Sequence, residues 1–363
     1  MVSDSEQAYE PRQLIGEEET FQRVEAVDDE GHKVEWRTAL YDSEDRAEVV
    51  ARRSLLRHQY RCMEALDEVA VVPSALAWFE VDDSPVEMGP EPVLQCERIE
   101  GPTLYEWMKT HAPDGVAPER ALEWVDAIAE MVEAVHDKGW LWRDFDPRGW
   151  VVLEDEELRP WSVSAALRKG PGPGSSGAVV NEDYTAPEVR RDEDGTHRKA
   201  TADIYGLGAL LSFLLSGIEP RHRVESPVSY PAYERIQEQG LAGLELLLGA
   251  TLQPLADKRL GQMEQLRAHL SVETLPTENS EEFADKHLPA PWIGLELDDP
   301  GSNRGLRSNI SSGPLVSMSS ESAPAKTPGA ARAEDEEAPA LHWPTLLIMG
   351  GIIALALAWV LLN

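Results

Sequence analysis

Residues 136–149 read His-Asp-Lys-Gly-Trp-Leu-Trp-Arg-Asp-Phe-Asp-Pro-Arg-Gly, and this stretch decides the fold together with the segments on either side of it. The segment before it is predicted to be an amphipathic helix, because apolar residues recur every three or four positions across 122–135. The segment after it contains residues 202–216, which are apolar nearly all round and are followed by Gly217. A helix of that composition, ended by glycine, is expected at the centre of a domain.

The chain before this stretch has a different pattern. Short β-type runs alternate with turns across residues 14–79, interrupted by one predicted helix at about 43–66. The order of elements therefore predicts an α+β fold in which a small β-rich lobe is followed by a larger α-helical lobe.

Five separated motifs resemble those of bacterial serine/threonine protein kinases. Residues 142–149, Trp-Arg-Asp-Phe-Asp-Pro-Arg-Gly, resemble the catalytic loop of that family, and residues 184–188, Tyr-Thr-Ala-Pro-Glu, resemble its A-P-E motif. Residues 203–208, Asp-Ile-Tyr-Gly-Leu-Gly, are similar to its central buried helix, and residues 255–259, Leu-Ala-Asp-Lys-Arg, to its closing motif. Residues 94–101 resemble the hinge strand between the lobes. The resemblance implies a bilobal protein-kinase-like fold.

The resemblance also implies a nucleotide pocket and domain boundaries. Cys96 falls at the gatekeeper position, Glu97 and Ile99 follow it in the hinge, and these three with Arg37 mark the pocket in which the family binds its nucleotide. The expected segments are an N-terminal tail at 1–12, an N-lobe with the hinge at 13–100, a C-lobe at 101–275, a flexible acidic Ser/Pro/Ala linker at 276–343 and a transmembrane helix at 344–362.

The loop that covers the nucleotide phosphates in the family has lost its glycines here. The three glycine positions fall at Glu17, Glu19 and Gln22. Glycine allows backbone N–H groups to approach phosphates closely, whereas two carboxylates there would repel them. A register shift would place Gly16 at one of these positions.

The phosphate-binding lysine and its partner also differ. The lysine position falls at Arg37, whose planar fork is not interchangeable with a compact ammonium. The helix-borne glutamate that pairs with the lysine falls at Gln59, so the family's ion pair is lost. An alignment with a gap would place Lys33 or Glu64 at these positions instead.

The resemblance places the Mg²⁺ ligands of the family at Ser162 and Gly149. Neither residue offers the carboxylate or amide oxygen found there in the family, so no metal site is predicted at these positions. Asp146 replaces the loop lysine and reverses the charge where negative charge accumulates during phosphoryl transfer. The alternative is that Asp155 or Asp146 supplies metal oxygens from a new position.

Asp144 stands at the general-base position with Arg143 beside it, and these two residues are the argument for residual catalysis. A base without a positioned, metal-neutralised donor accomplishes little. We therefore favour a structural role in which the Asp144 carboxylate accepts backbone N–H bonds within its loop.

Residues that hold a kinase C-lobe together are retained. The resemblance implies that Glu188 and Arg259 form a buried ion pair, and that Asp203 accepts backbone N–H bonds from the catalytic loop. Removing one partner of such a pair would leave a buried charge uncompensated.

The composition narrows the possible partners. The 363 residues include 66 Asp and Glu against 33 Lys and Arg, a formal net charge of −33. This field repels phosphate backbones and argues against nucleic acid as a partner. Ordinary solvation charge and adaptation to a saline habitat both remain open as the reason for the acidity. Two cysteines cannot build a disulfide framework, so a reducing compartment is expected.

The C-terminal segment is predicted to be a membrane anchor. Residues 345–362 contain no charged side chain over 18 positions and predict a transmembrane helix. Residues 276–343 carry 12 acidic and 5 basic side chains with little apolar periodicity, which is typical of a flexible tether. The first residues lack a signal-peptide pattern. We therefore expect a single-pass C-terminal membrane anchor with the kinase-like domain in the cytoplasm.

These patterns favour a pseudokinase, because fold-holding residues are kept while ATP- and metal-handling residues are replaced. Such a protein needs no cofactor and acts by binding a protein partner, for example a kinase, a phosphatase or a substrate. The alternative is a divergent serine/threonine kinase that uses ATP and Mg²⁺ to phosphorylate protein hydroxyls. A third hypothesis is a nucleotide bound without metal as a structural ligand.

Overall fold

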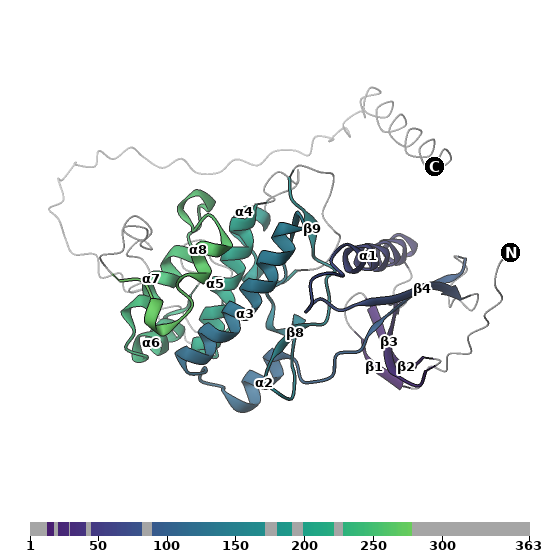
Figure 1. The fold of residues 1–363 in the computed structure, drawn as a ribbon, viewed down its shortest axis with the longest axis horizontal. Coiled ribbons are helices and arrows are strands. Elements are labelled where there is room, and N and C mark those ends of the chain that lie inside the picture. The colour runs from purple at the N-terminus through teal and green to yellow at the C-terminus, as the bar shows by residue number, and fades with distance from the viewer. Residues whose placement is uncertain are drawn as a thin grey trace, which may run out of the picture. The chain divides into compact units, whose positions relative to one another are not determined.

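The computed structural model describes residues 13–17, 21–28, 30–40, 45–81, 89–170, 180–190, 199–220 and 228–277. Within them a β-rich N-terminal part is followed by a helical C-terminal part (Figure 1). The predicted α+β architecture is confirmed, and the arrangement is consistent with a kinase-like fold.

The N-terminal part is built on a five-stranded antiparallel sheet with the order β1-β2-β3-β5-β4. Its strands are β1 (Gln13–Glu17), β2 (Phe21–Val27), β3 (Lys33–Ala39), β4 (Ala75–Val81) and β5 (Glu91–Glu97). The register places Arg23 opposite Arg37 and Glu35 opposite Cys96. Because side chains alternate along a strand, Arg23, Glu35 and Arg37 share one face of the sheet.

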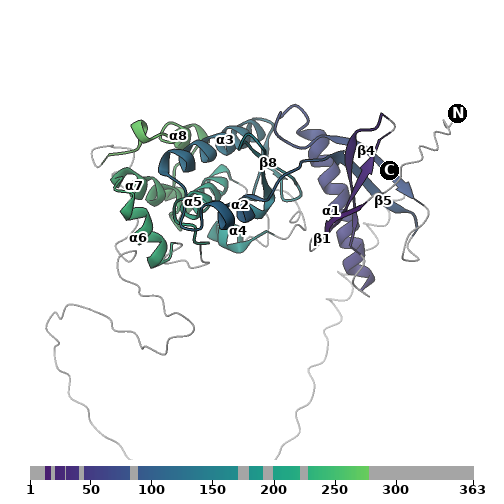
Figure 2. The same cartoon turned by 90° about the horizontal axis from the view of Figure 1, so that it is seen from below.

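Helix α1 (Arg46–Ala65) packs against β3, β4 and β5, and Figures 1 and 2 both place it alongside the sheet. It begins at Asp45, whose carboxylate accepts a hydrogen bond from the backbone N–H of Ala47. Its inner face is apolar except for the fully buried Gln59. A buried amide on that face requires a polar partner.

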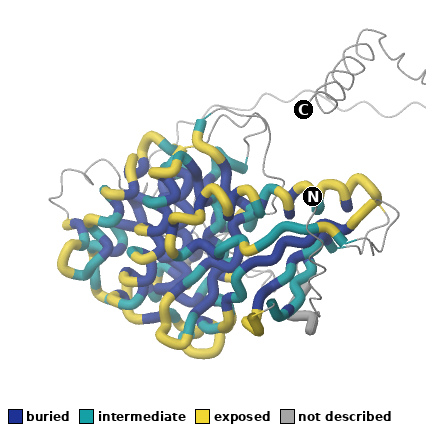
Figure 3. The backbone as a smooth tube through the Cα atoms, turned by 45° about the vertical axis from the view of Figure 1, so that its right-hand side comes forward, coloured by how far each residue is buried: buried dark blue, intermediate teal, exposed yellow. Residues whose placement is uncertain are grey.

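The C-terminal part surrounds helix α5 (Ala200–Ser216). All its residues from Ala202 onward are buried, and Gly217 ends it in the left-handed conformation with φ 66°. The predicted central helix is therefore confirmed. The surrounding helices are α2 (Leu104–His111), α3 (Pro118–Asp137), α4 (Pro187–Arg190), α6 (Tyr230–Glu238), α7 (Ala242–Thr251) and α8 (Met263–Arg267). Figure 3 shows the buried positions concentrated in the interior of this helical part and along the strands.

Gly206 of α5 positions the loop that carries residues 142–149. A Cβ atom at Gly206 would lie 2.1 Å from the Phe145 ring, so the missing side chain lets Phe145 pack directly on the central helix. The short elements around this loop are β6 (Trp140–Leu141), η1 (Pro147–Gly149), β7 (Trp150–Val152), β8 (Leu158–Pro160) and β9 (Leu167–Arg168). Those further along are η2 (Glu182–Tyr184), η3 (Ala256–Lys258) and η4 (Val272–Thr274).

In the part of the chain that the structure describes, no helix is long and apolar enough to cross a membrane. The transmembrane helix predicted at 344–362 lies outside the described residues. So do the tail predicted at 1–12 and nearly all of the linker predicted at 276–343.

Candidate functional site

Strand β5 leads from the sheet toward the C-terminal part, and Cys96 lies near its end. Cys96 is completely buried, and burial raises the pKa of its thiol to about 12. A thiol with that pKa stays protonated at neutral pH, so Cys96 acts as an apolar packing residue.

Glu97 ties the hinge to the C-terminal part. Arg159 of β8 donates from Nη1 to Oε1 at 2.6 Å and from Nη2 to Oε2 at 2.9 Å. These hydrogen bonds, together with the charge of Arg159, lower the pKa of Glu97. This two-point ion pair fixes the hinge strand relative to β8.

Ile99 packs in a small apolar cluster with Val151 of β7 and Trp161. All three residues are buried. They come from the hinge, from β7 and from the residue directly before Ser162, so their packing fills the space between the hinge and the C-terminal part. Ile99, one of the residues that the resemblance places around a nucleotide base, therefore packs against side chains of the protein itself.

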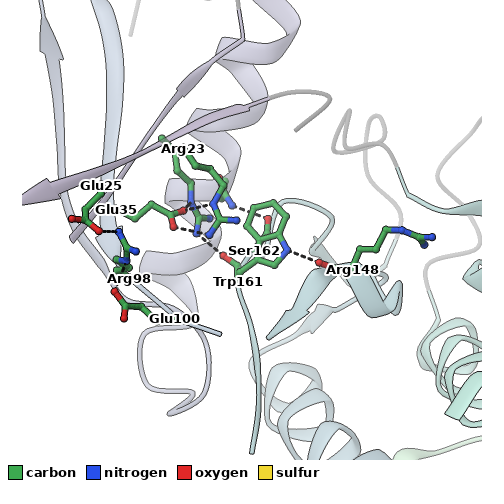
Figure 4. Close-up of polar contacts among 10 residues, drawn as sticks. Arg23, Glu25, Glu35, Arg98, Glu100, Arg148, Trp161 and Ser162 are labelled. Atoms are coloured by element: carbon green, nitrogen blue, oxygen red, sulfur yellow. Dashed lines mark hydrogen bonds and ion pairs between the residues drawn. The ribbon is translucent and has the colours of Figure 1, made fainter. Parts of the chain in front are cut away.

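Arg37 is engaged by the protein rather than exposed to a ligand. It is 1% exposed, and it donates from Nε to Oε1 of Glu35 at 2.6 Å and from Nη2 to the backbone carbonyl of Trp161 at 2.6 Å. Arg23 donates to both oxygens of the same carboxylate, at 2.9 and 2.7 Å. Figure 4 shows the Arg23–Glu35 pair and Trp161 together at the junction of the two parts.

Trp161 covers this charged network. The Arg37 and Arg23 guanidiniums lie 5.1 and 4.7 Å from the centroid of its ring. The indole Nε1 donates to the Arg148 carbonyl at 2.9 Å. Burial raises the pKa of Glu35, but the charges and hydrogen bonds of the two arginines outweigh it and hold that pKa below its ordinary value. Glu35 is therefore ionised, and the two guanidiniums share its single negative charge.

Gln59 finds its polar partner in Ser162. Its Nε2 donates to Ser162 Oγ at 2.8 Å, and both residues are buried. Beside it on α1, His58 Nε2 lies 2.8 Å from the Ala166 carbonyl. Hydrogen bonds thus attach α1, which carries Gln59 at the glutamate position of the family's ion pair, to residues 162–166, which begin with Ser162 at a metal-ligand position.

The residues at the metal-ligand positions do not fit Mg²⁺. Ser162 Oγ is already used by Gln59 and by Ser164, 3.1 Å away. Gly149 offers no side chain, and a Cβ atom there would lie 3.4 Å from Asp144 Oδ2. Asp155 lies in the exposed turn between β7 and β8, where it accepts the backbone N–H of Glu157. Within the described ranges, no group of three or more His, Cys, Asp or Glu residues could hold a metal ion.

Asp203 holds the loop that contains Arg143 and Asp144 through hydrogen bonds to the loop backbone. This fully buried carboxylate accepts the backbone N–H groups of Trp142 at 2.8 Å and Arg143 at 2.9 Å, and it lies 2.7 Å from His136 Nε2. Arg143 has φ 72°, a conformation that a non-glycine residue rarely adopts. The Asp203 hydrogen bonds stabilise that conformation.

Asp144 takes part in the internal structure of the loop. Its Oδ1 accepts the backbone N–H of Asp146 at 3.2 Å, and its carbonyl accepts from Trp142 Nε1 at 2.5 Å. The carboxylate therefore has a structural role independent of any proton transfer.

Asp146 is neutralised locally. It accepts the backbone N–H of Arg148 at 2.9 Å, pairs with Arg148 Nη1 at 3.1 Å and accepts from Asn181 Nδ2 at 2.8 Å. Arg148 also pairs with Glu219 at 2.8 Å and stacks 3.8 Å from the ring centroid of Tyr105. Burial opposes the charge of Arg148, but Glu219 and Asp146 raise its pKa. Asp146, which replaces the loop lysine, is thus part of a network of hydrogen bonds and ion pairs with Arg148, Glu219 and Asn181.

Glu188 and Arg259 form a bidentate pair with distances of 2.6 and 2.8 Å. The Arg259 side chain is fully buried, and its Nε also donates to the Gln253 carbonyl at 2.5 Å. The pair fixes α4 to the segment that precedes α8.

The fold and the positions of these motifs are consistent with a protein-kinase-like domain, and comparison with known proteins supports this class. No family model matches the chain. It is similar to the serine/threonine-protein kinase PknB of Mycobacterium leprae, 27% identical over 169 residues, and to PknB of Mycobacterium tuberculosis, 25% identical over 219 residues. It is also similar to the serine/threonine-protein kinase pkn2 of Myxococcus xanthus, 28% identical over 195 residues.

These alignments cover 46%, 58% and 52% of this chain, and 26%, 34% and 22% of the respective relatives. The chain therefore spans about a third or less of the length of these relatives. The similarity supports a kinase-like domain, whereas the activity and partners of the whole protein are matters for proposal.

Several functional residues were not identified from the sequence. Trp161 directly precedes Ser162 and fills the junction, but a single tryptophan carries no periodic signal. Glu35 and Arg37 share a strand face by their two-residue spacing, which could have indicated the pair, and Arg23 joins them through the strand register. The pairing of Arg159 with Glu97 could not be predicted, because the sequence does not show which strand faces the hinge.

Proposed function

We propose that this chain is a membrane-tethered pseudokinase, a kinase-like domain that does not transfer phosphate and acts by binding a protein partner. The observation that carries the proposal is the packing of Trp161 against Ile99 and Val151, with both Arg23 and Arg37 over its ring. A nucleotide would have to displace this packing and then compete with Glu35 for Arg37.

The lack of fitting metal ligands supports the same conclusion. Phosphoryl transfer depends on positioned metal ions and on neutralisation of charge on the transferred group. Ser162 is bonded to Gln59, Gly149 has no side chain, and Asp146, which stands at the position of the loop lysine, is paired with Arg148 and supplies no positive charge. The residues of this site therefore bind each other, and no phosphoryl-transfer step is assigned to them.

A thermal-shift measurement tests the proposal. We expect millimolar ATP, with and without Mg²⁺, to leave the midpoint of unfolding unchanged within about 1 °C, because a ligand that does not bind the native state does not stabilise it. An active bacterial serine/threonine kinase serves as the positive control. A clear Mg²⁺-dependent rise would contradict the proposal, and a rise with ATP in chelator would indicate a nucleotide held as a structural ligand.

A divergent active kinase is the second candidate, and the observation that favours it is the retained Asp144 beside Arg143. Autophosphorylation with labelled ATP that disappears in Asp144→Asn would establish this candidate. We expect no incorporation in either protein.

The tether is a separate part of the proposal. The uncharged segment 345–362 supports a C-terminal membrane anchor that confines the domain and its partner to a membrane surface. Deletion of residues 344–363 is expected to move the protein from the membrane pellet to the supernatant. A truncated protein that still sediments with membranes would locate the attachment elsewhere.

A further inference from the structure

Helix α1 is unusually basic for this chain. Residues 1–275 carry 54 acidic and 28 basic side chains, a net charge of −26, yet the 20 residues of α1 contain five arginines and two glutamates. Three of these arginines, Arg53, Arg57 and Arg61, are spaced four residues apart and therefore lie along one face. Like charges at this spacing destabilise a helix, so an opposite charge above them would be stabilising.

This face borders a groove between α1 and the sheet. The groove has a volume of about 530 Å³, and Arg53, Arg57 and Arg61 line its helical side. The opposite wall includes Pro90 and Pro92, with Glu80 of β4 as the carboxylate among the lining residues. Basic groups along one side and proline rings along the other form a surface suited to an extended, acidic peptide.

Two of the arginines have no ion-pair partner among the described residues. Arg53 pairs with Glu91 at 2.8 Å, whereas Arg57 and Arg61 are exposed and form no ion pair with any described carboxylate. The Arg57 guanidinium lies 5.7 Å from the centroid of the Trp78 ring. Most other described arginines are paired, in a chain where carboxylates outnumber basic groups two to one. Within the described ranges, no carboxylate uses the pairing capacity of Arg57 and Arg61.

Val50 adds an apolar contact at the same groove. It lines the groove and is 50% exposed, one of the few large apolar side chains that the described part exposes to this degree. An apolar residue beside unpaired charges is typical of a protein-binding surface and gives a peptide both anchoring and charge recognition.

We propose that the groove formed by α1 with β4 and β5 binds a carboxylate-rich, extended peptide segment of a partner protein. The argument is charge complementarity: this groove presents positive charge on an otherwise acidic domain, so it selects an acidic segment and orients it along Arg57 and Arg61. The inference deepens the proposed function, because it names the partner surface that a catalytically inactive domain would use.

Fluorescence anisotropy on the full chain tests this binding. The probe is a labelled peptide of about ten residues with a run of glutamates between alanine and proline, and its glutamine counterpart is the control peptide. We expect saturable binding of the glutamate peptide, weakened about fivefold or more in Arg57→Gln/Arg61→Gln because two charge contacts are lost. Lys258→Glu, an exposed site in η3, lowers the net charge by the same two units and is expected to bind like the wild type.

The outcomes separate the possibilities. Equal weakening by both variants means non-specific attraction by net charge and overturns the proposal. Absence of saturable binding also overturns it, whether the groove is inert or already covered by the chain itself or a second copy. A photoreactive leucine in the peptide that crosslinks to residues 46–65 or 89–92 supports it, and crosslinks confined to the helical part overturn it. Binding of ATP is measured independently, so failure of either proposal leaves the other intact.

Discussion

At the scale of single residues, charged side chains pair with each other where the family resemblance places the nucleotide phosphates. Glu35 is 1% exposed and is the shared partner of Arg23 and Arg37. Two guanidiniums and one carboxylate at a buried site are stable only as a set, because each group needs the others to offset its desolvation.

Replacing Glu35 with Gln should therefore strongly destabilise the domain. Both arginines lose their anionic partner, and we expect a loss of about 3–5 kcal/mol in the free energy of unfolding near neutral pH. Urea denaturation measures the loss. Glu100→Gln, at an exposed pair with Arg98, is the matched control and should change stability by less than about 1 kcal/mol.

The same pair of proteins gives a pH prediction. The folded-state pKa of Glu35 is lowered, so its stabilising contribution is complete above the unfolded-state value of about 4.3 and is lost as the pH falls through the folded-state pKa. The stability difference between wild type and Glu35→Gln should be constant from about pH 7 to pH 5 and shrink in stronger acid. A difference that grows on acidification would contradict the ionised state.

Trp161 makes a residue-scale prediction of its own. Trp161→Ala removes a buried indole from the cluster with Ile99 and Val151 and should cost about 3–5 kcal/mol. Trp78→Ala, at a partly exposed ring in β4, should cost less. Repeating the ATP thermal-shift measurement on Trp161→Ala then distinguishes two obstacles to nucleotide binding. If ATP now stabilises the protein, the tryptophan alone excludes the nucleotide; if not, the other differences, such as the Glu35–Arg37 pair and the missing metal ligands, suffice.

At the scale of elements, Gly206 couples the central helix to the loop of residues 142–149. A glycine-to-alanine change inside a helix normally stabilises it by up to about 1 kcal/mol. Here the new Cβ atom would meet the Phe145 ring at 2.1 Å, so Gly206→Ala should instead destabilise by about 1–3 kcal/mol. At Gly261 a Cβ atom would meet only Gln265 Oε1 at 3.6 Å, and Gly261→Ala should be nearly neutral by thermal denaturation.

The elements that were predicted from sequence are those with a strong local signal. The apolar segment 202–216 and its terminating glycine predicted α5 to within two residues, and the β-type runs across 14–79 predicted a strand-rich N-terminal part. The contacts of the site were not predictable in this way. The link between Gln59 and Ser162 joins residues 103 positions apart, and its formation depends on how α1 packs on the sheet. Local pattern gives an element's type, whereas partner choice between distant side chains is a property of the packed molecule.

At the scale of the whole molecule, acidity is distributed rather than confined to one patch. The net charge of −26 on residues 1–275 is opposed locally by ion pairs such as Arg267 with Asp126 and Glu133. Specific ion pairs of this kind stabilise the folded state. Repulsion among the excess carboxylates destabilises the compact state. Salt weakens both effects, so its net influence on stability shows which one is larger.

We expect the long-range repulsion to be larger, because carboxylates outnumber basic groups two to one. Raising NaCl from about 0.1 M to about 1 M shortens the Debye length from about 10 Å to about 3 Å and should raise the midpoint of thermal unfolding by several degrees. KCl at the same ionic strength is the control, because screening does not depend on the identity of the monovalent cation. A midpoint that falls with salt would mean that exposed ion pairs contribute more to stability than the net charge removes. A rise with one cation alone would indicate specific ion binding instead of screening.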